Sequence, residues 1–122
     1  MSQLYAFGVW IVKPGREDDF VAAWRTLAEW TASNAPGAGI SRLLQDEDQP
    51  SRFISIAPWD DRDALAASRS QLGFQERIAG LREMLETFTP ANLDVRAEVA
   101  AAPLSAQRSA WVDHVEDRYS RT

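Results

Sequence analysis

The sequence predicts an α+β fold in which four strands and two helices follow one another in the order β-α-β-β-α-β. Three observations predict this fold. In residues 4–12 and 52–59, apolar side chains occupy both the odd-numbered and the even-numbered positions, which face opposite sides of a strand. This pattern is typical of strands in the interior of a sheet. Two amphipathic segments, about 16–33 and 60–88, have helical periodicity. A polar turn at 46–51 separates two short strand-like stretches, as in a hairpin.

The composition is that of one globular domain and limits the possible partners. The chain has 122 residues, 45% of them hydrophobic, with five Trp and five Phe, which suffices for a packed core. The net charge of -5 and the lack of a basic aromatic patch argue against a nucleic acid partner. No apolar run reaches the roughly 20 residues of a membrane span, and the first residues do not resemble a signal peptide. We therefore expect a cytoplasmic protein with no membrane partner.

The chain contains no Cys and one His, His114. Disulfides, thiolate nucleophiles and a multi-histidine metal site are therefore excluded. The acidic residues Asp60, Asp61 and Asp63 stand at the expected start of a helix, where they satisfy the cap and the helix dipole. We interpret them as capping residues and predict no metal site.

The first strand and the first helix are supported by their ends as well as by their patterns. Residues 4–12 read LYAFGVWIV, and the breaker pair Pro14-Gly15 follows. From Arg16 to about Ser33, acidic residues at 17–19 suit the positive end of the helix dipole. The apolar stripe of this helix consists of Phe20, Trp24, Leu27 and Thr31, with Val21 and Ala28 beside it.

The second half of the chain predicts a hairpin and a second helix. A breaker cluster at 35–39 precedes the paired strands 40–45 and 52–59. Asp60 or Asp61 can cap the helix that follows. We expect this helix to break near Leu72-Gly73 and then resume until Thr89-Pro90, with its stripe formed by Phe74, Ile78, Leu81, Leu85 and Phe88.

The last predicted strand covers 92–99, because apolar and polar residues alternate strictly there. This pattern is typical of a half-exposed strand at the edge of a sheet. We take residues 1–100 as one domain and 101–122 as a C-terminal extension. The extension can form a short helix with Trp111, Val115 and Tyr119 on one side.

Two β-α-β units joined by a hairpin predict a ferredoxin-like fold with an antiparallel sheet in the order 4-1-3-2. Both helices then cover one face of the sheet. The other face carries an apolar row that requires a partner, so we predict a homodimer packed as a dimeric α/β barrel. The row assigned to this interface consists of Leu4, Ala6, Trp10, Val12, Ile54 and Ile56.

The face expected beneath the helices forms either a ligand cavity or a packed core. The strands contribute Phe7, Val9, Ile11, Phe53, Ser55, Ala57 and Trp59 to it. The helices contribute Phe20, Trp24, Leu27, Phe74, Ile78 and Leu81.

Four segments resemble the antibiotic biosynthesis monooxygenase family of dimeric α/β barrels, over about residues 7–99. They are VKPGREDDF, the PGAG-to-strand junction, RFISIAPWDDRDAL and GFQERIAGLREMLETF, in this order and spacing. The resemblance implies a ligand cavity between sheet and helices in each subunit. Several members oxygenate anthrone-like phenols with O2 and use no flavin, metal or haem, whereas relatives degrade haem or bind small metabolites. No His lies between Asp60 and Thr89, which disfavours haem degradation.

Cofactor-free oxygenation needs a substrate that ionises, a dry pocket and a hydrogen-bond donor near the developing charge. The resemblance implies that Trp59 matches a tryptophan of quinone-forming members, whose indole N–H can donate to a substrate oxygen; packing against the next helix is the alternative. Ser55 lies where some members have an Asn, and Val9 replaces another Asn and offers no donor. We take Trp59 and Ser55 as the candidate catalytic residues.

The candidate substrate-binding residues are Phe7, Val9, Trp24, Phe53, Phe74 and Ile78. Trp24 and Phe74 could line a flat aromatic ligand or simply pack the core. Arg25 and Arg69 could reach the mouth of a cavity, although a solvated helix face is the favoured interpretation of each.

The sequence therefore predicts a monooxygenase without cofactor or metal that oxidises an aromatic polyketide-like phenol or anthrone with O2. Two alternatives remain open. One is a non-catalytic protein of the same fold that binds a small aromatic or apolar ligand. The other is an isomerase or cyclase that acts on a similar ring system.

Overall fold

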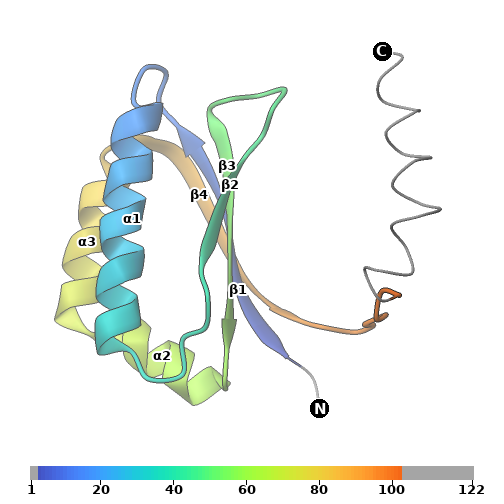
Figure 1. Ribbon diagram of the computed structural model, residues 1–122. Helices are drawn as coiled ribbons and strands as arrows, with labels where there is room; N and C mark the ends of the chain where they lie inside the picture. The colour runs from blue at the N-terminus through green and yellow to red at the C-terminus, as the bar shows by residue number, and fades with distance from the viewer. Residues whose placement is uncertain (1–2, 103–122) are drawn as a thin grey trace, which may run out of the picture.

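The computed structural model describes residues 3–102, which form one antiparallel sheet with all helices on one face (Figure 1). The elements are β1 (Leu4–Val12), α1 (Glu17–Asn34), β2 (Arg42–Gln45), β3 (Arg52–Trp59), α2 (Arg62–Ser70), α3 (Leu72–Arg82) and β4 (Leu85–Asp94). The strand order is β2-β3-β1-β4, which is the predicted order counted from the other edge. The ferredoxin-like α+β fold is thus confirmed. The predicted tail helix and His114 lie outside the described residues.

The second helical region begins and breaks where the sequence predicts. The Asp61 side chain accepts a hydrogen bond from the Ala64 backbone N–H at 2.7 Å, which caps α2. Gln71 then adopts an extended conformation between α2 and α3. The break turns α3 into a separate helix that packs beside α1 (Figure 1).

The observed bounds of β4 differ from those predicted for the last helix and the last strand. Helix α3 ends at Arg82 and β4 begins at Leu85, whereas we expected a helix as far as Phe88 and a strand over 92–99. The segment from Thr87 to Thr89 is rich in β-forming residues, and β4 pairs along the whole of β1. This pairing outweighs a helical periodicity that three or four apolar residues can produce by chance. Pro90 is tolerated because β4 is an edge strand.

The register between β1 and β3 shows which side chains of β1 lie beneath the helices, and it differs from the prediction. The pairs are Leu4 with Trp59, Ala6 with Ala57, Gly8 with Ser55, and Trp10 with Phe53. Directly opposed residues share a face, so even-numbered β1 residues lie beneath the helices together with odd-numbered β3 residues. The prediction that Phe7, Val9 and Ile11 face the helices is wrong. The placement of Leu4, Ala6, Trp10 and Val12 at a dimer interface is also wrong. Because β1 is apolar in both sets, its periodicity could not decide between the two faces.

The core lies between the helices and the sheet. Its main cluster contains Trp10, Val12, Phe20, Leu27, Phe53, Leu81 and Leu85. A smaller cluster at the other end of the sheet contains Leu4, Ala35, Trp59 and Leu65. The sheet face opposite the helices, here called the outer face, carries Tyr5, Phe7, Val9, Ile11, Ile54 and Ile56, and none of these belongs to either cluster.

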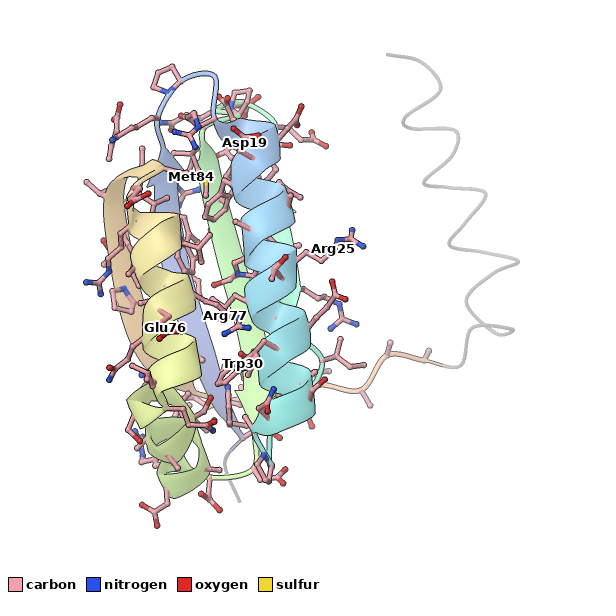
Figure 2. All side chains as sticks on the ribbon, turned by 90° about the vertical axis from the view of Figure 1, so that its left-hand side faces the viewer. Asp19, Arg25, Trp30, Glu76, Arg77 and Met84 are labelled. Carbon is pink, nitrogen blue, oxygen red and sulfur yellow. The ribbon has the colours of Figure 1, made fainter. Side chains whose placement is uncertain are left out.

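Helices α1 and α3 meet along a tight seam. A side chain at Gly73 would clash with the Trp30 ring, because an added Cβ would lie 2.8 Å from Trp30 Cε2. The Arg77 guanidinium lies over the same ring, 5.0 Å from its centroid (Figure 2). The seam therefore holds the helices as one layer over the sheet.

Candidate functional site

A cavity of about 270 Å³ lies between the helix layer and the sheet. Its volume is just below the roughly 300–1,000 Å³ typical of small-molecule sites. The walls come from α1, α2, α3, β1, β3 and the edge strand β4, and most of the lining side chains are apolar or aromatic. The cavity is therefore suited to a small, planar, largely apolar ligand.

Six of the eight predicted site residues line this cavity: Phe7, Trp24, Ser55, Trp59, Phe74 and Ile78. Phe7 forms part of the floor, since the strand pleat directs its side chain to the outer face. Val9 does not line the cavity and lies on the outer face, so its lack of a donor has no bearing on the site. Phe53 is 2% exposed and packs against Phe20, with ring centroids 5.1 Å apart. Phe53 is thus a core residue outside the cavity.

Trp10 and Ser55 form a hydrogen-bonded pair in the cavity wall. The indole N–H of Trp10 donates to Ser55 Oγ at 2.9 Å. The Trp10 ring is fixed by a stacked contact with Phe88, with centroids 3.9 Å apart and an interplanar angle of 21°. Because Trp10 occupies an acceptor position of the hydroxyl, the Ser55 proton remains available for another oxygen. Ser55 is therefore positioned as a donor.

Gly8 makes room for this pair. It lies on the cavity side of β1, directly opposite Ser55. An added Cβ would lie 3.0 Å from Ser55 Oγ, 3.0 Å from Trp10 Nε1 and 2.9 Å from the Phe88 ring. A larger residue at this position would displace at least one of the three side chains.

Trp59 lies two positions beyond Ala57 on the same face of β3 as Ser55. Its side chain is 5% exposed, packs with Leu4 and Leu65, and also lines the cavity. The main chain of Trp59 is held by Gln3, whose side-chain amide donates to the Trp59 carbonyl oxygen at 2.8 Å. The indole N–H donates to no other residue in the described range 3–102. Both the packing role and the donor role are compatible with this arrangement.

Helix α2 contributes a polar end to the cavity. Ser68 is 2% exposed, and its Oγ has no hydrogen-bond partner among the described residues. The adjacent Arg69 is half-buried, and burial lowers the pKa of its guanidinium. Arg82, at the end of α3, also lines the cavity and is exposed.

The described lining residues include no Asp, Glu, His or Cys. Within residues 3–102, no group of three such side chains could hold a metal ion. The cavity therefore offers hydrogen-bond donors and positive charge, but no side chain that acts as a general base at neutral pH.

Sequence reasoning missed Trp10, Gly8 and Phe88, which depend on the strand register and on the true start of β4. It also missed Ser68. The spacing of the sequence does indicate that Ser68 is buried, because Ser68 follows Leu65 by three residues and therefore lies on the same side of α2.

The model of the antibiotic biosynthesis monooxygenase family matches residues 5–80, more than half of the chain. The chain belongs to this family. The matched segment contains Ser55, Trp59, Ser68 and Arg69 and ends before β4.

Solved structures show the same fold at low sequence identity. A variant of SnoaB, a cofactor-independent oxygenase from Streptomyces nogalater, is 23% identical, with a TM-score of 0.76 over 83% of this chain and 100% of that chain. A protein from Shewanella oneidensis is 19% identical, with a TM-score of 0.69 over 77% of this chain and 91% of that chain. No curated protein matches the sequence. None of the described helices is long and apolar enough to cross a membrane.

Proposed function

We propose that this member of the family is a cofactor-independent monooxygenase that oxidises an anthrone-like aromatic phenol with O2. One observation carries the proposal. The Ser55 hydroxyl, held as a donor by Trp10, shares an otherwise largely apolar cavity with the Trp59 indole. The similarity of the fold to that of SnoaB, a cofactor-independent oxygenase, supports the same reaction class.

In the overall reaction, a ring methylene group of the substrate and one molecule of dioxygen give a ring carbonyl group and one molecule of water. The methylene carbon is oxidised by four electrons and loses both of its hydrogen atoms. One oxygen atom becomes the carbonyl oxygen, and the other leaves as water. The electrons come from the ionised substrate, so the protein needs only to favour ionisation and to hold the substrate in a largely apolar cavity.

The donors of the cavity are suited to that task. Donation from Ser55 and Trp59 to the substrate oxygen stabilises the enolate or phenolate that forms when the substrate loses its proton. Since the described lining has no general base, the proton passes to solvent and the acidity of the bound substrate is raised by these donors. Trp24 and Phe74 supply flat apolar surface against the ring system.

The second candidate function is non-catalytic binding of a small aromatic metabolite. The predominance of apolar and aromatic side chains in the lining favours it. Oxygenation is preferred because several donors converge on the same cavity, which binding of an apolar ligand does not require.

We also propose that the chain acts as a homodimer through the outer face. This face is a row of large apolar side chains from the two central strands, with no helix over it in the described chain (Figure 1). A second copy packed face to face would remove it from water.

Oxygen uptake tests the proposed reaction. The metal-free protein is mixed with 1,8-dihydroxy-9-anthrone, and oxygen consumption and quinone formation are followed together. We expect one quinone per O2 consumed. Replacing Trp59→Phe keeps an aromatic ring but removes the N–H, and should lower the rate roughly a hundredfold to a thousandfold.

The matched control is Trp30→Phe, which alters a tryptophan in the α1–α3 seam outside the cavity (Figure 2). This variant should retain the wild-type rate. Failure of the wild-type protein to turn over any of a varied set of anthrones, while still binding them, would favour the non-catalytic function.

A further inference from the structure

We propose that the cavity is built for an aromatic ligand that carries an anionic oxygen group, and that Arg69 and Ser68 of α2 bind this group. The inference rests on the proposed function and deepens it, because it specifies the substrate as an aromatic acid.

The charge of the cavity differs in sign from that of the whole chain. The sequence has 18 Asp and Glu against 13 Lys and Arg. The charged side chains that line the cavity in the described structure are Arg69 and Arg82, and no carboxylate accompanies them. A local positive site in an acidic protein favours an anionic ligand.

Arg69 has no acidic partner in the described structure. The ion pairs there join Arg16 to Asp19, Arg52 to Asp46, and Arg62 to Asp94. Arg69 is half-buried, and the resulting desolvation disfavours its charged form. An anion bound beside it would replace the lost hydration and the missing counter-charge.

Ser68 supplies an independent observation. Three other hydroxyl side chains in the helices bond back to the main chain: those of Thr26 and Thr31 in α1 donate to the Ala22 carbonyl at 3.2 Å and the Leu27 carbonyl at 2.9 Å, and that of Ser70 in α2 donates to the Ala67 carbonyl at 2.9 Å. The Ser68 hydroxyl makes no such bond, although it is almost fully buried and lines the cavity. Burial of an unpaired hydroxyl is unfavourable unless a ligand forms the missing hydrogen bond.

The two residues are consecutive on α2 and both line the cavity, so we infer that the long guanidinium side chain and the hydroxyl bind the same oxygen group. A carboxylate has two oxygen atoms, one of which can accept from the guanidinium and the other from the hydroxyl. A ring attached to that carboxylate would extend into the aromatic part of the cavity, lined by Trp24, Phe74 and Phe88.

A pair of probes of nearly equal shape tests the proposal: 2-naphthoate, which is anionic at pH 7, and 2-naphthamide, which is neutral. Isothermal titration calorimetry gives the affinity of each for the full-length protein at 50 mM NaCl. We expect wild type to prefer the acid by about tenfold or more, as for hydrogen bonds to a charged group. At high salt this preference should shrink because charges are screened, whereas amide binding should not.

Two substitutions and a control locate the effect. Arg69→Gln should reduce the preference for the acid to within about twofold while leaving the affinity for the amide unchanged. Arg25→Gln removes the same charge from an exposed position on α1 that points away from the helix layer (Figure 2), and should keep the wild-type preference. Ser68→Ala should weaken acid binding several-fold without lowering the melting temperature, since its hydroxyl has no partner to lose.

The outcomes separate this inference from the proposed function. Equal affinity for acid and amide in wild type, or a preference that survives Arg69→Gln, would overturn the inference and leave aromatic binding intact. Absence of binding by both probes would overturn the inference, whereas the proposed function is judged separately by oxygen uptake with the anthrone. If both Arg69→Gln and Arg25→Gln abolish the preference for the acid, the preference comes from the net charge of the protein, and the inference is overturned as well.

Discussion

Trp10 connects the core of the protein to the candidate site. Its ring packs against Phe20 and Phe88 in the core, while its indole N–H fixes Ser55 in the cavity wall. Packing between β1, α1 and β4 therefore fixes the Trp10 ring, and the Trp10 ring in turn fixes the Ser55 hydroxyl. Gly8 leaves room for this arrangement, because an added Cβ there would lie 2.9 Å from the Phe88 ring and 3.0 Å from Ser55 Oγ.

A double-mutant cycle should measure the hydrogen bond between Trp10 and Ser55. Trp10→Phe and Ser55→Ala each remove one partner, and urea unfolding of the two single variants and the double variant gives their coupling. We expect a coupling free energy of about 0.5–1.5 kcal/mol, as for a partly buried neutral hydrogen bond. Additive effects of the two substitutions would show that the bond does not stabilise the fold.

At the scale of elements, we expect a glycine-to-alanine substitution in α3 to have opposite effects on stability in the α1–α3 seam and on the exposed surface of α3. Gly73→Ala forces a Cβ into the Trp30 ring and should destabilise the fold by about 1–3 kcal/mol. Gly80→Ala, on the same helix with nothing near its added Cβ, should be neutral or stabilising by up to about 1 kcal/mol.

Thermal and urea unfolding of both variants would check this pair. Similar destabilisation by both would mean that the glycines matter for helix geometry rather than for the approach of Trp30.

The elements that the sequence predicted well are those with clear signals at their ends. The Asp61 cap, the break near Leu72 and the polar turn at 46–51 all lie where their local chemistry places them. The start of β4 was missed because Leu85 and Phe88 continue the spacing of the α3 stripe, and only pairing with β1 reveals them as strand residues. Long-range pairing of this kind leaves no periodic signal in a short segment.

The same limit explains which cavity-lining residues could be predicted from the sequence. Ser55 and Trp59 are four residues apart on one strand, so their shared face follows from the pleat alone. Trp24, Phe74 and Ile78 follow from helical stripes. The position of Trp10 depends on which of two apolar faces of β1 turns inward, and that choice is made by its register with β3.

At the scale of the whole molecule, the outer face determines the expected state of association. Light scattering should give the mass of a dimer at micromolar concentration, because the row including Phe7, Val9 and Ile54 has no cover in the described chain. Ile54→Lys places a charge in the middle of this row and should yield a folded monomer. A monomeric wild-type protein at this concentration would contradict the dimer.

Family membership and fold do not by themselves establish the reaction. The same layered architecture supports different chemistry according to what its cavity presents. In this chain the cavity is lined by the Ser55 hydroxyl that Trp10 holds, by Trp59, by the unpaired hydroxyl of Ser68 and by the half-buried Arg69, among aromatic side chains. The central claim is that this cavity holds the reacting substrate.

Oxygen uptake by a cavity-filling variant tests that claim most directly. Ala57→Phe adds a ring between Ser55 and Trp59, whereas Ala22→Phe adds the same ring at an exposed position on α1. With both variants confirmed as folded by circular dichroism, we predict that Ala57→Phe consumes O2 with 1,8-dihydroxy-9-anthrone at less than about one-tenth of the wild-type rate, and Ala22→Phe at the full rate. Undiminished oxygen uptake by the Ala57→Phe variant would contradict the account.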